Sequence, residues 1–118
     1  EMGRAYDIAE RMRAGNEKPI VKIDEDHSFK INTGKSAVLY INAVSRDKEK
    51  DEFEIMDDII RAALGQEGLD YIAEQDMPMA NIALIVNVIM AAIADVPLEE
   101  VEDVEQEKSQ KKSPKRIK

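Results

Sequence analysis

The sequence of 118 residues contains no cysteine and no tryptophan, and aromatic residues make up only 4% of it. Without cysteine the chain has no disulfide framework and no thiolate metal site, which fits a reducing compartment. With so few aromatics, the core is expected to consist of Ile, Val, Leu, Met and Ala. The length of the chain predicts a single small domain. The N-terminal stretch is charged throughout and shows no signal peptide, so we expect the domain in the cytoplasm.

Histidine is nearly absent as well, since His27 is the only one. A single histidine excludes a metal site built from several histidines. If it served as the base for a nucleophile, no second histidine would remain for another role. The run Asp24–His27 could hold a divalent ion, but no EF-hand spacing follows it, so we expect a solvated turn between two strands. The pairs Asp57–Asp58 and Glu99–Glu100 diverge by about 100° on a helix and are interpreted as solvated faces. The sequence predicts no catalytic residue, no metal ligand and no cofactor, and therefore no enzyme.

One triplet, Gly34-Lys35-Ser36, matches the end of a phosphate-binding loop, G-x-x-x-x-G-K-[ST]. That loop needs a glycine five positions earlier, where this chain has Phe29. The stretch "SAVLYINAV" after the triplet is rich in β-branched and aromatic residues, which favours a strand. We therefore predict a hairpin turn in which Gly34 supplies a positive φ, and no nucleotide site.

The hydrophobic pattern predicts an α+β fold, mostly α-helical, with an N-terminal β-hairpin followed by about three helices around one small core. Residues 1–19 form an N-terminal segment with the pattern of a short helix ended by Gly15. A single domain is expected over 20–98. Its predicted elements are a strand at 20–24, a hairpin over 27–45, and helices over 51–64, 66–76 and 79–95.

The first of these three helices carries clear boundary signals. Asp51 with Glu54 three residues later resembles a capping box, and Gly65 is expected to end the helix. Between them Phe53, Met56 and Ile60 repeat at helical spacing, which predicts a core-facing side.

The segment 79–95, "MANIALIVNVIMAAIAD", is almost wholly apolar. Fifteen such residues span about 22 Å as a helix, short of the roughly 30 Å hydrocarbon core of a membrane, so no membrane partner is expected. A helix that is apolar all round is usually buried on all sides, which is hard to achieve in so small a domain. Two interpretations stay open: simple burial by the rest of the chain, or cover by a second chain. The candidate partner-binding residues are Met77, Met79, Ile82, Ile85, Val86 and Ile89.

Charge is distributed unevenly over the chain, whose formal net charge is −8. An acidic body argues against nucleic-acid binding, because phosphate contacts need clustered Lys and Arg. Residues 99–118 are predicted to be a charged, disordered tail that ends in the basic stretch "KKSPKRIK". This stretch resembles a short nuclear-import or nucleic-acid arm, and it also fits a polar tail that keeps a sticky domain in solution.

The order of elements resembles the tail assembly chaperones of long-tailed bacteriophages (siphophages), including those carried as prophages. The resemblance rests on "FKINTGKSAVLYI", then "DEFEIMDDIIRAALGQEGLDYIAEQ", then the apolar "NIALIVNVIMAAIAD" and a charged tail. It covers roughly residues 20–100 and is a pattern of elements, with no catalytic residue to transfer. The extra N-terminal "MGRAYDIAERMRAGNEKP" departs from that pattern.

The resemblance implies a non-catalytic chaperone in the host cytoplasm. Such a protein binds the long, apolar tape-measure protein and keeps it soluble while tail-tube subunits polymerise around it. In that family a longer form often arises by ribosomal frameshifting. The competing hypothesis is a small regulatory or nucleic-acid-associated protein that uses the basic tail.

Overall fold

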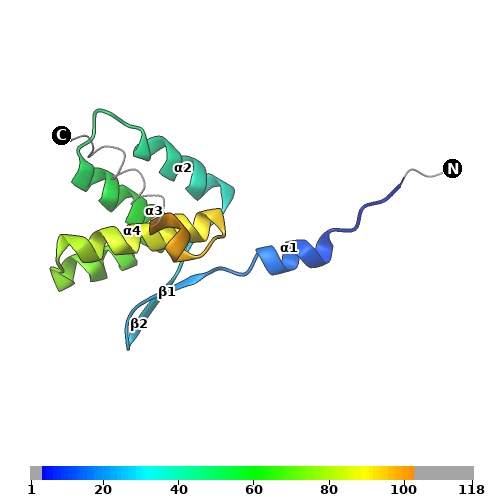
Figure 1. Ribbon diagram of the computed structural model, residues 1–118, viewed down its shortest axis with the longest axis horizontal. Coiled ribbons are helices and arrows are strands. Elements are labelled where there is room, and N and C mark those ends of the chain that lie inside the picture. Colours follow the sequence, from blue (N-terminus) through cyan, green and yellow to red (C-terminus); the bar gives the residue numbers. More distant parts are fainter. Residues whose placement is uncertain (1–3, 103–118) are drawn as a thin grey trace, which may run out of the picture.

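The computed structural model describes residues 4–102. Its elements, in chain order, are α1 (Ala9–Gly15), β1 (Ile20–Asp24), β2 (His27–Lys30), α2 (Lys35–Ser45), α3 (Glu52–Gln75) and α4 (Met79–Ala94). Figure 1 shows α2, α3 and α4 gathered into one body, with the hairpin below and α1 standing apart. The fold is therefore α+β and mostly helical, with a hairpin ahead of the main helices, as the sequence predicts.

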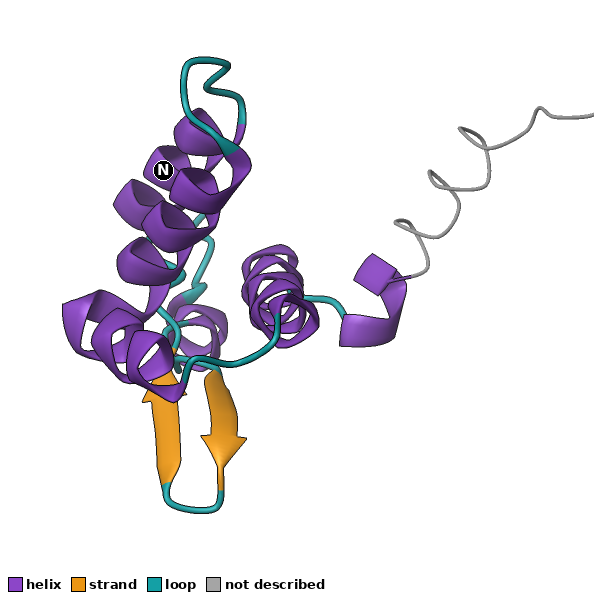
Figure 2. Ribbon diagram, turned by 90° about the vertical axis from the view of Figure 1, so that its left-hand side faces the viewer, coloured by secondary structure: helices purple, strands orange, loops and turns teal. Residues whose placement is uncertain are grey.

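The hairpin is made by β1 and β2, which pair antiparallel with Val21 opposite Phe29. Between the strands lies the acidic turn, where the Asp24 carboxylate accepts a hydrogen bond from the Asp26 N–H at 2.9 Å. This turn confirms the expectation for the run Asp24–His27. In Figure 2 the two strands hang from one side of the helical body.

The predicted hairpin over 27–45 is wrong in its second half, because residues 35–45 form α2. Ile41 and Val44 are buried on the side of α2 that packs on α3, so helical spacing overrides the strand propensity of this stretch. Gly34 has φ −65°, not the predicted positive value, and precedes the first turn of the helix. Its N–H donates to the Asn32 side chain at 2.9 Å, which fixes the chain where the helix begins.

Helix α3 begins and bends where the sequence predicts. The Asp51 carboxylate accepts from the Glu54 N–H at 2.9 Å and the Glu54 side chain accepts from the Asp51 N–H at 3.3 Å, which completes a capping box. Gly65 has φ 84° and ψ 167°, so it divides α3 into two helical halves at the predicted boundary. Residues 66–75 and α4 then correspond to the other two predicted helices.

One hydrophobic core joins the hairpin and the three main helices. Its most completely buried side chains are Ile31, Ile41, Ile60 and Ile89, one from each part of the body. Phe53 is 61% exposed, so its predicted core position is wrong, whereas Ile60, two turns further along the same helix, is buried as predicted. The core consists of aliphatic residues, as the shortage of aromatics implies.

The segment 4–15, called the arm below, contains α1 and extends away from the body, which it meets at its end, where Ala14 and Gly15 line a hollow with Ala92 and Ile93 of α4. No residue of α1 is buried, and the arm gives the molecule its long dimension of 69 Å. The radius of gyration is 17.7 Å, whereas a compact 100-residue domain has about 13 Å. The short N-terminal helix predicted to end at Gly15 is confirmed.

The C-terminal end of the described chain is also helical, over residues 98–102. The remaining residues of the predicted tail, including the basic stretch and Ser113-Pro114, lie outside the described residues.

Candidate binding surface

Helix α4 has one buried side and one side that reaches the surface. Ile89 is 0% exposed and lies wholly in the core of this chain, so it is not free to contact a partner. Ile85 is 6% exposed and belongs to the core, but it also lines the groove described below. Met77, Ile82 and Val86 are half-buried at the edge of the core. Met79 and Leu84, which point about 140° apart on the helix, are 45% and 44% exposed. Simple burial therefore accounts for Ile89 alone. Of the other predicted residues, Met77 and Ile85 line the groove described below, whereas Met79, Ile82 and Val86 reach the surface outside it.

A groove runs between β1 and α4, and we call it the β1–α4 groove. Its volume is about 210 Å³. It is lined by Val21, Lys22, Ile23, Met77, Asn81, Leu84, Ile85 and Val88. A cavity of roughly 150 Å³ holds a benzene molecule, so this groove has room for one or two apolar side chains. Since most of the lining is aliphatic, the groove suits an apolar segment and offers few polar groups to bind a charged metabolite.

The hairpin that forms one wall of this groove is fastened to the second half of α3. The Asp24 carboxylate accepts hydrogen bonds from the Tyr71 hydroxyl and, at 3.0 Å, from His27 Nδ1. The His27 ring stacks on the Tyr71 ring with centroids 4.0 Å apart and planes at 20°. Phe29 packs beside Tyr71 and over Gly68, where a Cβ would lie 3.6 Å from the Phe29 ring. The wall is thus held by aromatic stacking and a shared carboxylate.

The chemistry of this cluster is structural. The hydrogen bond from Tyr71, followed by that from His27, lowers the pKa of Asp24 to about 2. The same carboxylate raises the pKa of Tyr71 to about 12. A nucleophile or general base needs a pKa near the working pH, and a phenol at about 12 is further from neutrality than usual. The cluster therefore positions the hairpin against α3.

Replacing Tyr71 by phenylalanine tests this fastening, because it keeps the ring and removes only the hydroxyl. We expect the pKa of Asp24 to rise from about 2 towards its usual 3.8, stopping short of it because His27 still donates. Carboxyl chemical shifts followed through an acid titration measure the change. An unchanged midpoint would contradict the hydrogen bond.

The sign of the pH dependence follows from these two shifts. The lowered pKa of Asp24 contributes stability that is present above pH 3.8 and is lost as the pH falls towards about 2. The raised pKa of Tyr71 contributes stability that is present below pH 10.0 and is lost as the pH rises towards about 12.

The second buried carboxylate is Asp58, which is 7% exposed. It accepts from Lys50 Nζ at 2.5 Å and from Arg61 Nη1 at 3.0 Å. The hydrogen bond from Lys50, followed by that from Arg61, lowers the pKa of Asp58. The prediction of a solvated face is therefore wrong for Asp58, although Asp57 beside it is exposed. Asp58 ties the loop before α3 to the helix, and its own charge is paired with two cations.

The triplet Gly34-Lys35-Ser36 lies at the start of α2 and not in a hairpin turn. It thus follows a strand and opens a helix, as a phosphate loop would, but the chain still has Phe29 in place of the first glycine. The hollow beside Ser36 is walled by Asp58 and by Arg61, whose guanidinium already binds that carboxylate. A carboxylate in the wall repels phosphate, so this hollow does not suit a nucleotide.

Within residues 4–102 no group of three or more His, Asp or Glu side chains is placed to hold a metal ion. In the same part of the chain, no helix combines the length and apolar character needed to cross a bilayer. The sequence matches no protein-family model, no curated protein and no solved structure.

Sequence reasoning missed two features of this surface. The pairing of Asp24 with Tyr71 joins positions 47 apart, and nothing in the local pattern of either segment indicates it. The burial of Asp58 had a weak signal, since Asp58 lies next to the apolar pair Ile59-Ile60 and three residues before Arg61, a spacing at which side chains meet on a helix.

Proposed function

We propose that this chain is a non-catalytic binding protein that holds an apolar segment of another polypeptide in the β1–α4 groove. The observation that carries the proposal is the groove itself, which is aliphatic and open at Leu84 in a chain whose body is acidic. A helix laid into an apolar groove is a common mode of peptide recognition. The net charge of −8 would keep a complex with a sticky client dispersed.

We further propose that the client is a phage tape-measure protein and that the chain acts as a tail assembly chaperone in the cytoplasm of the host. The support is the resemblance in the order of elements, together with a groove that fits the aliphatic side chains of a long amphipathic helix. The function needs surplus apolar surface and no catalytic residue. Contact with tail-tube subunits is part of the same proposal.

The experiment is co-expression with the protein encoded immediately downstream of this gene, where the proposal places the tape-measure protein, followed by light scattering of the soluble fraction. The wild-type chain is expected to bring that neighbour into solution in a complex of defined mass. Leu84→Asp puts a charge in the groove at a position that is 44% exposed, so the body stays folded while the client is lost.

The matched control is Leu39→Asp, a leucine of α2 that is 58% exposed and does not line the groove. It is expected to retain the complex. If the neighbour stays insoluble with the wild-type chain, the chaperone proposal fails. If both variants lose the client equally, the groove is not the binding site.

A further inference from the structure

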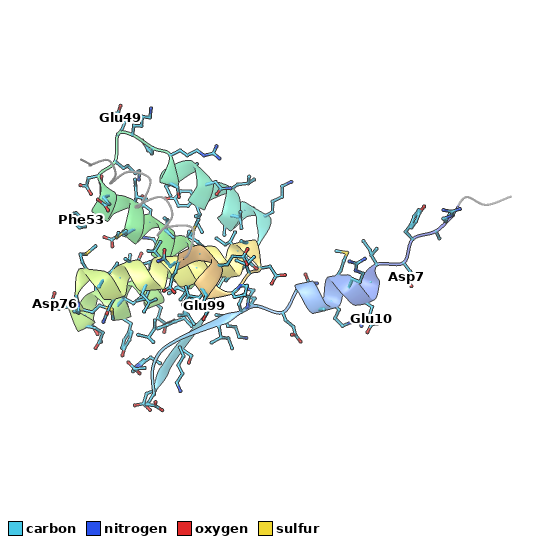
Figure 3. All side chains as sticks on the ribbon, in the orientation of Figure 1. Asp7, Glu10, Glu49, Phe53, Asp76 and Glu99 are labelled. Atoms are coloured by element: carbon cyan, nitrogen blue, oxygen red, sulfur yellow. The ribbon has the colours of Figure 1, made fainter. Side chains whose placement is uncertain are left out.

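The arm presents an apolar face that nothing in its own chain covers. Tyr6, Ile8 and Met12 are 76%, 51% and 55% exposed. Ile8 and Met12 are four residues apart, and the Met12 N–H donates to the Ile8 carbonyl at 2.8 Å, so both side chains lie on one face of the helix. Figure 3 shows the side chains of the arm, Asp7 and Glu10 among them, with no other element beside them.

A helix this short does not persist by itself. α1 has seven residues, whereas isolated helices shorter than about 12–15 residues are marginal in water. Helices of that length are stabilised by packing an apolar face against a surface. The arm therefore needs a surface of complementary size and character.

We propose that this surface is the β1–α4 groove of a second copy of the chain, with the two copies exchanging arms about a two-fold axis. The groove is aliphatic and has room for one or two side chains, which matches Ile8 and Met12. In a two-fold exchange each copy gives one arm and receives one, so both grooves are filled at once. The proposal does not depend on the client, although a filled groove would exclude the client proposed above.

Charge also favours a second copy as the occupant. Residues 4–15 hold three arginines and two acids, whereas residues 17–102 hold eight lysines and arginines against nineteen aspartates and glutamates. A mildly basic arm is attracted to an acidic body, which helps the encounter. The groove itself is lined by one charged residue, Lys22, so apolar contact must hold the arm there.

The course of the chain directs the arm away from its own groove. Pro19 is anchored to the body, because its carbonyl accepts from the Ile31 N–H at 2.8 Å. Lys18 precedes a proline and is therefore biased towards extended backbone. Only residues 16–19 separate α1 from β1, and Figure 1 shows the arm continuing away from the body at this point. A fold-back would require a sharp reversal in this short linker.

The absence of cysteine allows a direct test with the full chain. One chain carries Met12→Cys and a second carries Leu84→Cys, and the mixture is oxidised and run on a non-reducing gel. A disulfide needs Cα atoms within about 7 Å, so the mixed dimer reports docking. We expect it to form at least ~10-fold faster than the mixed dimer of Met12→Cys with Phe53→Cys, because docking brings the thiols to millimolar effective concentration.

Phe53→Cys is the matched control, since Phe53 is 61% exposed and does not line the groove. Light scattering of the wild-type chain should give twice the 13.3 kDa chain mass at high concentration, and Ile8→Asp should return the monomer. Ile8 touches nothing in the core, so that variant stays folded.

Two results would overturn the proposal. One is a monomeric mass for the wild-type chain over a full dilution series. The other is an intramolecular disulfide in the double variant Met12→Cys/Leu84→Cys, which would show that the arm folds back on its own groove. The client is tested separately, by co-expression and by titration with a synthetic client segment.

Discussion

Replacing Ile89 by alanine is expected to lower the free energy of unfolding by about 2–5 kcal/mol, the range for large-to-small changes in a packed core. Ile89 is completely buried, and it lies on the side of α4 that faces the hydrophobic core. The total free energy of unfolding of a domain of this size is about 5–15 kcal/mol, so the expected loss is a large share of it. Urea denaturation followed by circular dichroism measures it.

The control lies on the same helix. Leu84→Ala removes a side chain of the same size that is 44% exposed, and we expect it to cost less than half as much as Ile89→Ala. The two variants are compared at a dilution where the chain is monomeric, and equal losses there would mean that Leu84 is buried within its own chain. That outcome would count against Leu84 as an open position.

Replacing Gly65 by alanine is expected to destabilise the fold by about 1–3 kcal/mol. Gly65 has φ 84° and ψ 167°, a region that is essentially restricted to glycine. No atom lies within 4 Å of a Cβ built there, so the expected loss comes from backbone strain and not from a clash. The kink also places Ala63 near the end of the first half of α3, where its carbonyl accepts from the Asn32 N–H at 2.8 Å.

Gly15→Ala is the control for this prediction. Gly15 also has no atom within 4 Å of a built Cβ, but its φ is not positive and it ends the unsupported helix α1. We expect no measurable loss of stability there. A Gly65→Ala variant as stable as the wild type would contradict the kink, because a straight α3 would tolerate alanine at this position.

Local signals were sufficient for the helical half of the fold. The capping box at Asp51 and Glu54 and the break at Gly65 depend on residues within one turn of each other, and both are present where the sequence predicts them. The strand pair around the acidic turn is likewise local.

The sequence-based predictions were wrong where tertiary packing, and not local propensity, determines the secondary structure. The stretch after Gly34 has the composition of a strand, yet Ile41 and Val44 are three residues apart and reach the core together only from a helix. The same limit applies to the candidate surface. Sequence alone shows that α4 is apolar all round, but which side the body covers depends on where α3 and β1 lie.

The central claim is that the β1–α4 groove holds an apolar segment of another polypeptide. The most direct measurement is a map of amide and methyl chemical shifts as a synthetic amphipathic segment of the downstream helix-rich protein is added to the chain. The account predicts that the shifts gather at Val21, Ile23, Leu84 and Val88, with α2 unaffected. Chemical-shift changes that gather on α2 would contradict the account. The absence of any change at the highest peptide concentration would also contradict it.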